Sequence, residues 1–239
     1  MAKTLGIIGS GMIGGAVARL AVAAGLDVVL SNSRGPKTLI GLVDELGTQA
    51  RAATPAEAAR AGDLVVAAVP LKAYDRLPAA DLAGRTVIDA MVFHPQRDGA
   101  VAGLDTGELT SSALVQRHLA GSRVVKTFAT IDFHHLVTLA RPAGATDRSA
   151  LPVAGDDSAA NAQVIALLDA LGYDAVDTGT LADSWRLAPG TPAYVQPYMG
   201  ERPQGLSQED AQRWFFASQG VPVPAARVKE LTDAATREN

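Results

Sequence analysis

Three glycines near the start of the chain have the spacing of a loop that binds dinucleotides. Gly9, Gly11 and Gly14 fit the pattern G-x-G-x-x-G directly after an apolar run. In such a loop the first glycine permits a tight turn, the second lets the backbone approach a pyrophosphate, and the third lets the next helix pack closely on the sheet. The start of that helix offers unpaired N–H groups to an anion. A glycine-rich turn without a ligand is the alternative, but the flanking strand and helix favour dinucleotide binding.

The segment SNSRGPK at residues 31–37 follows the second apolar run and contains two cations and no acid. A site for NAD places Asp or Glu near this point to bind the ribose 2′-hydroxyl, whereas this chain has Asn32. Ser33 offers a hydroxyl, Arg34 a planar fork and Lys37 a point charge, and these groups suit a 2′-phosphate. A solvated turn with two surface cations is the alternative. The missing acid favours NADP over NAD.

A third candidate anchor is the sequence AAVP at residues 67–70, where another apolar run ends. Ligands of open α/β sheets bind at the carboxyl ends of the strands. We therefore expect Val69 and Pro70, with Ala68 beside them, to line the nicotinamide half of a bound dinucleotide. A plain strand end is the alternative.

Runs of Val, Ile and Leu alternate with Ala-rich segments that favour helices, and this alternation is typical of βαβ units with covered strands. The predicted strands are residues 4–9, 27–31, 64–69, 86–89, 123–127, 151–154 and 175–177. The predicted helices are residues 12–24, 36–46, 54–61, 111–119 and 158–171. The fold class predicted is α/β, a Rossmann-type doubly wound, mostly parallel sheet with a small C-terminal cap or arm.

Several helix ends carry local signals. Gly25 suits a left-handed residue after the first helix, and Gly172 follows the last long helix. Thr54 precedes Pro and is followed three residues later by Glu, which predicts a capped start. Asp156 and Asp157 stand before a predicted helix, where a carboxylate accepts unpaired N–H groups. We therefore interpret this pair as caps rather than as catalytic carboxylates.

The chain is predicted to divide near residue 183. Residues 1–182 form the expected NADP-binding Rossmann domain, and residues 183–239 form a cap or arm that contributes to the substrate cleft. This second part is rich in Pro, Gly and Tyr and contains the cluster Trp214, Phe215 and Phe216. Packing of that cluster on the Rossmann domain or on a second copy is expected, and a homodimer is predicted.

Composition excludes several classes of protein. The 239 residues are 48% hydrophobic and 19% charged, with a formal net charge of -4, so no broad basic face for nucleic acid is expected. The chain has no cysteine, which excludes disulfides, thiolate metal sites and cysteine nucleophiles. No apolar run approaches the roughly 20 residues that span a bilayer. No signal peptide is expected, so a cytoplasmic protein without a membrane partner is predicted.

A set of longer motifs carries a family resemblance. The motifs are GSGMIG at 9–14, SRGPK at 33–37, VIDAMVFHPQRDG at 87–99, VVKTFATI at 124–131, PVAGDD at 152–157 and DAVDTGTLADSWRLAPGTPAY at 174–194. With these motifs the chain resembles the NADP oxidoreductases that depend on coenzyme F-420, a deazaflavin. The resemblance implies hydride transfer between NADP(H) and the deazaflavin, which would stack over the nicotinamide between the Rossmann domain and the C-terminal part.

The resemblance also implies roles for particular residues. It places Ser10, Met12 and Ile13 in the pyrophosphate loop, and Thr130, Ile131 and Phe133 near the nicotinamide. The predicted cofactor-binding residues are Gly9, Ser10, Gly11, Met12, Ile13, Gly14, Asn32, Ser33, Arg34, Lys37, Ala68, Val69, Pro70, Met91, Thr130, Ile131 and Phe133. The catalytic residues are not identified; Thr130, Ile131 and His134 are the candidates, and no metal is expected.

Two positions depart from the family pattern. Met91, within DAMVFHP, and Ala129, within KTFATI, stand where the family often has Asn. Loss of both amides leaves a more apolar pocket. An NADPH-dependent reductase of a small carbonyl or imine is therefore a second hypothesis, and an NADP-binding sensor without turnover is a third.

Histidines supply the remaining candidates for chemistry. His134 and His135 lie near Asp132, but adjacent side chains diverge in a helix or a strand and rarely bind one ion. One of these histidines, or His94, could protonate a carbonyl or imine after hydride delivery. A structural role for each is the alternative.

Overall fold

A computed structural model describes residues 3–101, 103–104 and 106–237 of the chain. Its centre is an eight-stranded sheet with the order β3-β2-β1-β4-β5-β6-β7-β8. Neighbouring strands are parallel except for β6 and β7, which are antiparallel. The strands are β1 (Thr4–Ile8), β2 (Asp27–Ser31), β3 (Ala50–Ala52), β4 (Leu64–Ala67), β5 (Thr86–Asp89), β6 (Arg123–Lys126), β7 (Ala150–Gly155) and β8 (Asp174–Asp177). The predicted doubly wound, mostly parallel sheet is confirmed.

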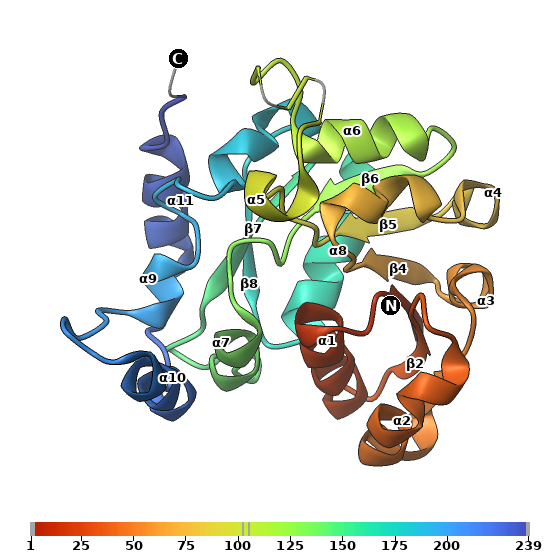
Figure 1. Ribbon diagram of the computed structural model, residues 1–239, viewed down its shortest axis with the longest axis horizontal. Coiled ribbons are helices and arrows are strands. Elements are labelled where there is room, and N and C mark those ends of the chain that lie inside the picture. Colours follow the sequence, from red (N-terminus) through yellow and green to blue (C-terminus); the bar gives the residue numbers. More distant parts are fainter. Residues whose placement is uncertain (1–2, 102, 105, 238–239) are drawn as a thin grey trace.

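Helices connect these strands and cover both faces of the sheet (Figure 1). The α-helices are α1 (Met12–Ala23), α2 (Ile40–Leu46), α3 (Pro55–Ala61), α4 (Ala79–Leu82), α5 (Pro95–Asp98), α6 (Ser111–His118), α7 (Phe133–Thr138), α8 (Ser158–Ala170), α9 (Gln196–Met199), α10 (Gln208–Ala217) and α11 (Ala225–Asp233). Short 3-10 helices are η1 (Pro36–Leu39), η2 (Gly47–Gln49), η3 (Leu71–Arg76) and η4 (Leu181–Leu187).

The strands place alternate side chains in two hydrophobic cores. Leu5 and Ile7 of β1 belong to the core covered by α1, α7, α8 and α11, whereas Ile8 belongs to the core covered by α3, α4 and α6. The same alternation continues in the neighbouring strands β2 and β4. It follows from the period of two in an extended chain, which turns successive side chains to opposite faces.

The C-terminal segments lie beside β7 and β8, where Figure 1 shows α9, α10 and α11 in blue along the left side. Val228 and Leu231 of α11 are buried in the same core as the sheet. The N–H of Ala150 at the start of β7 donates to the carbonyl of Val223 at 2.8 Å. The last part of the chain is thus fixed to the sheet, and a division near residue 183 stays a prediction.

The local signals at helix ends are confirmed except at Asp156, whose carboxylate accepts the N–H of Leu181 at 2.9 Å and does not cap α8. Gly25 has a φ of 82° and Gly172 a φ of 97°, both in the left-handed region that favours glycine. Thr54 forms a capping box with Glu57: each side chain accepts the backbone N–H of the other residue. Asp157 caps α8 by accepting the N–H of Ala160 at 2.8 Å.

Several elements differ from the sequence predictions. The edge strand β3 was not predicted, because its residues are two alanines and Arg51, which give no apolar alternation. The strand β4 ends at Ala67, two residues earlier than predicted. Helices α7 and α11 were not predicted either. α7 has six residues, too few to show a helical period.

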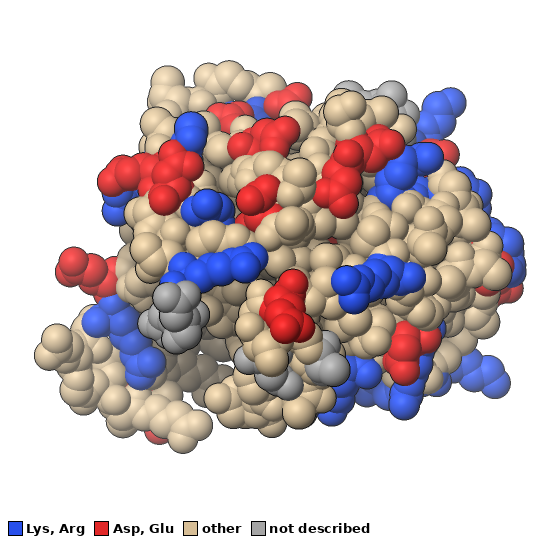
Figure 2. All heavy atoms as spheres, turned by 90° about the horizontal axis from the view of Figure 1, so that it is seen from above, with Lys and Arg blue, Asp and Glu red and all other residues tan. Residues whose placement is uncertain are grey.

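Charged side chains are mixed over the surface in view. Figure 2 shows acidic and basic groups interspersed on the face that lies at the top of Figure 1. Among the described residues, no helix combines the length and the apolar character that crossing a bilayer requires.

We predict that Thr54→Ala lowers the free energy of unfolding by about 1 kcal/mol, since it removes the hydroxyl that accepts the N–H of Glu57. Loss of this cap lowers the stability of the whole fold, because α3 buries Ala58 and Ala59 in the core. Ser207→Ala is the matched control: Ser207 caps α10, whose described residues are not buried, so its loss stays local. Urea unfolding of both variants measures the difference, and equal losses would contradict this account.

Candidate functional site

The glycine loop is fixed by the end of β2. The N–H groups of Gly9 and Ser10 donate to the carbonyl of Ser31 at 2.9 and 3.2 Å. Gly9 has a φ of 101°, and a Cβ there would lie 2.4 Å from the carbonyl oxygen of Ala68. Only glycine therefore allows β1, β2 and the loop after β4 to meet at this point.

Gly14 and Gly11 show the two other roles that glycine has in such a loop. A Cβ on Gly14 would lie 1.9 Å from the carbonyl oxygen of Gly9, so helix α1 could not approach β1 with any other residue. A Cβ on Gly11 would have no atom within 4 Å and would project into open space. That space adjoins a cleft, as a pyrophosphate site requires.

Helix α1 begins beside this open space. Its first turn contains Met12 and Ile13, and first-turn N–H groups have no carbonyl partner within a helix. No side chain caps the helix at Gly11. Met12 is 69% exposed. These N–H groups are therefore available to an anion bound against the loop.

A cleft of about 390 Å³ lies over the glycine loop. It is lined by Gly11, Met12, Ile13, Ala68, Val69, Pro70, Ala90, Met91, Val92, His94, Arg97, Phe128, Ala129, Ile131, Asp132, Phe133, Tyr194 and Val195. The structure thus brings together nine residues of the predicted cofactor-binding set: Gly11, Met12, Ile13, Ala68, Val69, Pro70, Met91, Ile131 and Phe133. Their contact with a cofactor stays a prediction.

The predicted 2′-phosphate site lies on the turn after β2. Asn32 accepts the N–H of Arg34 at 2.9 Å and donates to the Thr38 hydroxyl at 2.9 Å, which gives the turn a defined shape. Ser33, Arg34 and Lys37 are exposed. In the described ranges, neither cation forms an ion pair. Two unpaired cations thus stand at the carboxyl end of β2, next to the loop.

The predicted site residues that do not line the cleft are Gly9, Ser10, Gly14, Asn32, Ser33, Arg34, Lys37, Thr130 and His134. Ser10 donates its hydroxyl to the carbonyl of Ser31 at 3.0 Å. Thr130 is buried, and its carbonyl accepts the N–H of Val195 at 2.8 Å. The His134 ring is 2.8 Å from the carbonyl of Ser218 and packs against α10. A catalytic role for Thr130 or His134 has no support from this placement, since neither side chain reaches the open space.

The other histidines separate in the same way. His135 is fully buried, and its Nδ1 lies 2.6 Å from a carboxylate oxygen of Asp132. His94, by contrast, lines the cleft. Within the part of the chain that the structure describes, no group of three His, Asp or Glu side chains has an arrangement that could hold a metal ion.

A buried ion pair shapes the cleft from behind. Asp89 ends β5 and Lys126 ends β6, and their charged atoms are 3.2 Å apart. Asp89 also accepts the Ser112 hydroxyl at 2.7 Å and the Met91 N–H at 2.9 Å, while Lys126 donates to the carbonyl of Met91. The pair therefore fixes the backbone that carries Met91. Sequence analysis did not identify it, although an acid and a base that end two apolar strands are a signal for such a pair.

Asp98 fixes the next part of the same loop. Its carboxylate accepts the N–H of His94 at 2.9 Å and contacts the Arg97 guanidinium at 2.8 Å. Burial opposes ionisation, but the hydrogen bonds from Arg97 and from the N–H groups of His94 and Lys72 outweigh it and lower the pKa of Asp98 to about 2. Asp98 is therefore ionised at neutral pH and holds the loop in place.

The two non-glycine residues with positive φ in the described chain both line the cleft. Phe128 has a φ of 61° and Val195 a φ of 54°. This conformation is costly for a β-branched residue such as Val195. Strained backbone of this kind concentrates at functional sites, where the surrounding structure enforces it. Both positions were missed by sequence analysis, because a side chain's identity does not reveal an imposed φ.

A second cavity of about 580 Å³ adjoins the cleft. Val92 and Ala129 line both spaces, so they form a shared wall. The far side of the second cavity contains Trp185 and Arg237, with the guanidinium carbon of Arg237 5.1 Å from the indole centroid. This side comes from η4 and from the end of the chain, which the sequence predicted as a cap.

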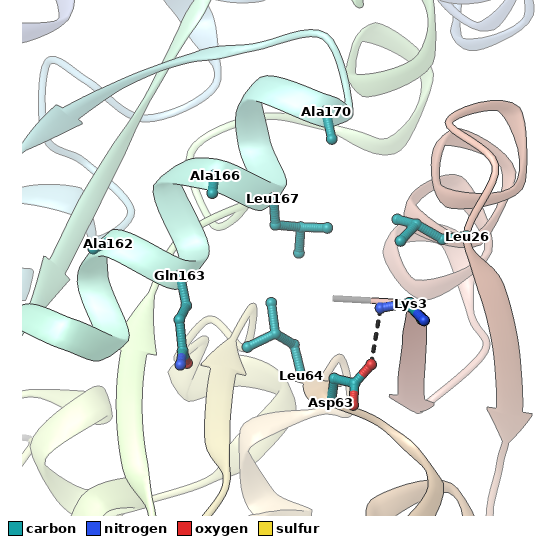
Figure 3. Close-up of a pocket in the computed structure, with 9 residues that line it drawn as sticks. All are labelled: Lys3, Leu26, Asp63, Leu64, Ala162, Gln163, Ala166, Leu167 and Ala170. Atoms are coloured by element: carbon teal, nitrogen blue, oxygen red, sulfur yellow. Dashed lines mark hydrogen bonds between the residues drawn. The ribbon is translucent and has the colours of Figure 1, made fainter. Parts of the chain in front are cut away.

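A third cavity, of about 640 Å³, lies at the amino ends of β1 and β4 and is lined partly by α8 (Figure 3). Leu26, Leu64 and Leu167 point into it. Its carboxylate, Asp63, already accepts the backbone N–H of Lys3 at 2.8 Å. Ligands of open α/β sheets bind at the opposite ends of the strands. The glycine loop and its cleft, although smaller, are therefore the candidate site.

The aromatic cluster predicted in the C-terminal part packs on α7. The ring centroids of Phe215 and Phe216 lie 5.7 and 6.2 Å from that of Phe133. Phe216 keeps 51% of its surface exposed. Packing on the body of the molecule is confirmed, and a homodimer through this surface stays a prediction.

Comparison with known proteins agrees with the site. Residues 4–93 match the family described as "NADP oxidoreductase coenzyme F420-dependent". The hypothetical protein SMa0349 from Sinorhizobium meliloti is 32% identical; the match covers 82% of this chain and 94% of that protein, with a TM-score of 0.70. A provisionally named F420-dependent NADP reductase from Arthrobacter sp. FB24 is 24% identical, with 77% and 87% of the two chains covered and a TM-score of 0.63.

A shorter match joins this chain to protein YjhV of Escherichia coli K12. The two are 43% identical over 53 residues, which are 22% of this chain. The match spans 39% of the length of YjhV. The fold and the matched family define the class: the chain is an NAD(P)-dependent oxidoreductase. By its match over residues 4–93 it belongs to the family described as "NADP oxidoreductase coenzyme F420-dependent".

We predict opposite effects for two glycine substitutions in the loop. Gly14→Ala inserts a methyl group against the Gly9 carbonyl and lowers the free energy of unfolding by about 1–3 kcal/mol. Gly11→Ala leaves stability unchanged, since its Cβ meets open space, but it weakens NADPH binding at least tenfold, or about 1.4 kcal/mol. Thermal unfolding and a fluorescence titration measure the two effects. Unchanged NADPH affinity in Gly11→Ala would contradict the assignment of the pyrophosphate to this loop.

Proposed function

We propose that the protein transfers a hydride between NADP(H) and the deazaflavin coenzyme F-420. The observation that carries this proposal is the shared wall between the cleft and the second cavity. A dinucleotide on the glycine loop would place its nicotinamide in the cleft, and a second ligand would bind in the adjoining space, which shares Val92 and Ala129 with the cleft. Family membership supports the same pair of ligands.

The turn after β2 supports NADP rather than NAD. A 2′-phosphate is negatively charged, and Arg34 and Lys37 can donate hydrogen bonds to it. Hydrogen bonds between charged groups are stronger than those between neutral groups. Asn32 uses its side chain within the turn, on Arg34 and Thr38, and supplies no carboxylate. An acid at this position would repel the phosphate, so the turn discriminates between the two dinucleotides by charge.

When bound, NADPH supplies the hydride, and the chain supplies orientation. The pyrophosphate would bind the first turn of α1, which fixes the distance from the loop to the cleft. Val69 and Pro70 on one side and Ile131 and Phe133 on another give the cleft apolar walls. Such walls exclude water and hold donor and acceptor in a near-attack geometry, which accounts for much of the acceleration of a hydride transfer.

The second cavity suits the remaining part of a large acceptor. Thr110, Ser111 and Thr191 line it, together with Trp185 and Arg237. An indole face offers stacking to a flat ring, and a guanidinium offers charge to an anionic chain. This combination fits a deazaflavin with an acidic tail better than it fits a small neutral substrate.

A second candidate function is reduction of a small carbonyl or imine by NADPH. Met91 and Ala129 lie on the cleft wall at the positions where the family often has amides. Their apolar side chains reduce the number of donors that face an acceptor ring. This observation favours a smaller, less polar acceptor, and the assay below distinguishes the two functions.

We predict that Arg34→Ala raises the Kd for NADPH by about 10- to 100-fold, which corresponds to a charge-assisted bond of about 1.5–3 kcal/mol. The Kd for NADH stays within about twofold, since NADH has no 2′-phosphate. Arg213→Ala is the control, because Arg213 is an exposed cation on α10, paired with Glu209. Isothermal titration measures all three proteins. Equal small losses of affinity for the two dinucleotides would contradict the assignment of the 2′-phosphate to this turn.

We predict that enzyme, NADPH and oxidised coenzyme F-420 together bleach the visible absorbance of the deazaflavin. The reaction slows in Gly11→Ala at low NADPH and recovers as NADPH rises, since that variant affects dinucleotide binding. A stopped-flow or plate assay gives both results. Oxidation of NADPH by a carbonyl or imine, without bleaching at high enzyme concentration, would contradict the deazaflavin and support the second candidate.

A further inference from the structure

Four side chains with titratable or charged groups line the otherwise apolar cleft: His94, Arg97, Asp132 and Tyr194. The polar groups of two of these side chains already form hydrogen bonds or ion pairs within the protein. Arg97 donates to the carbonyl of Val92 and to Asp98. Asp132 caps α7 and holds the buried ring of His135. His94 and Tyr194 are therefore the groups whose polar atoms remain for chemistry.

These two groups lie together across the cleft. The Tyr194 hydroxyl and Nε2 of His94 are 3.5 Å apart, and the rings meet edge to face at a centroid distance of 6.5 Å. The distance is long for a hydrogen bond, but catalytic hydrogen bonds are often long without ligand and shorten in the complex. The two residues are separated by 100 positions in the sequence, so the contact depends on the fold.

Strained backbone positions Tyr194. The next residue, Val195, has φ 54° and ψ -52°, and the N–H of Gln196 donates to the Tyr194 carbonyl at 2.6 Å. This is a γ-turn of the rare, strained form. The N–H of Val195 is held by the carbonyl of Thr130. The strain is thus imposed by the loop after β6, and it directs the Tyr194 side chain to the cleft.

The loop after β5 positions His94 from the other side. Asp98 accepts the His94 N–H, and the Asp89–Lys126 pair holds Met91, three residues earlier. The His94 backbone is therefore fixed at both ends of a short segment. From this backbone the His94 ring lies edge to face with the Tyr194 ring.

We propose that Tyr194 and His94 form the proton-donating pair of this site, with Tyr194 as the group that reaches the acceptor. The inference rests on the proposed hydride transfer. Reduction adds a hydride from NADPH to a carbon of the acceptor and leaves an electron pair on a nitrogen or oxygen. The Tyr194 hydroxyl gives its proton to that atom, Nε2 of His94 gives a proton to the tyrosine oxygen, and solvent restores the proton of His94. Overall, NADPH, one proton and the oxidised acceptor give NADP⁺ and the reduced acceptor.

The surroundings of the pair agree with this order. Burial raises the pKa of Tyr194, although the Arg97 guanidinium acts in the opposite direction. The hydroxyl is therefore protonated at neutral pH and acts as a donor. The charged groups that face the pair are Arg97 and Asp98 from α5 and Asp132 from the start of α7.

The test is a kinetic comparison of two tyrosine–histidine pairs. Tyr194→Phe keeps the ring and removes the proton, and we expect kcat for reduction of coenzyme F-420 to fall about a hundredfold, with the Kd for NADPH unchanged. Tyr74→Phe is the matched control. Tyr74 meets His118 edge to face at 5.8 Å, but neither residue lines the cleft, so kcat stays at the wild-type value. Wild-type kcat in Tyr194→Phe would overturn the proposal.

The pH dependence separates the two members of the pair. In the wild-type protein kcat falls as rising pH removes the proton from the pair, and His94→Gln abolishes this dependence at a lower kcat. In the double variant Tyr194→Phe/His94→Gln, kcat falls no further than in the more impaired single variant, because the effects of residues that act as a unit are not additive. Fully multiplicative losses, or an unchanged pH profile in His94→Gln, would contradict the pair.

A measurement without turnover tests the placement itself. NADPH should shift the NMR signal of the His94 ring and leave that of His118 in place, and Tyr194→Phe should shift the same His94 signal. Absence of both shifts would overturn the pair even if the enzyme is active. If the deazaflavin is not reduced but the His94 signal shifts, the proposed acceptor is wrong and the proposed pair is supported. The kinetic comparison is then repeated with a carbonyl or imine as the acceptor.

Discussion

The buried ion pair between Asp89 and Lys126 is the constraint on which both cavities depend. Lys126 is 3% exposed and Asp89 is fully buried, so each charge relies on the other, and loss of one partner from such a pair costs about 3–5 kcal/mol. Both residues end strands at the carboxyl edge of the sheet. By holding Met91 from its N–H and its carbonyl, the pair fixes Val92, and so it fixes the wall between the two cavities.

Strand order decides what else meets at that wall. The chain leaves β1 toward β2 and β3, then returns to β4 on the other side, and the crevice at this reversal is where open α/β sheets bind ligands. The glycine loop, the AAVP turn and the loops after β5 and β6 all end there. Residues 194–195 close the space from the C-terminal part. The proposed dinucleotide and acceptor sides are thus built from different segments that share one edge.

The sequence predicted the features that local chemistry determines. The glycine spacing, the Thr54 capping box and the left-handed Gly25 follow from backbone geometry within a few residues, and the structure confirms each. Most strands and long helices were predicted for the same reason. The edge strand β3 and the short helix α7 were not, because three or six residues carry too little periodicity to be distinguished from a loop.

The candidate site was predictable only on the side of the glycine loop. That side uses consecutive residues, whereas the pairs Asp89–Lys126 and His94–Tyr194 join residues that are 37 and 100 positions apart. Neither has a spacing rule that a single sequence reveals. The positive φ of Val195 is similar, since no glycine marks it. The loop after β6 imposes that strain through the Thr130 carbonyl and directs Tyr194 across the cleft. An oxidoreductase of this fold can therefore keep its dinucleotide loop unchanged while its acceptor side changes through contacts that are distant in sequence.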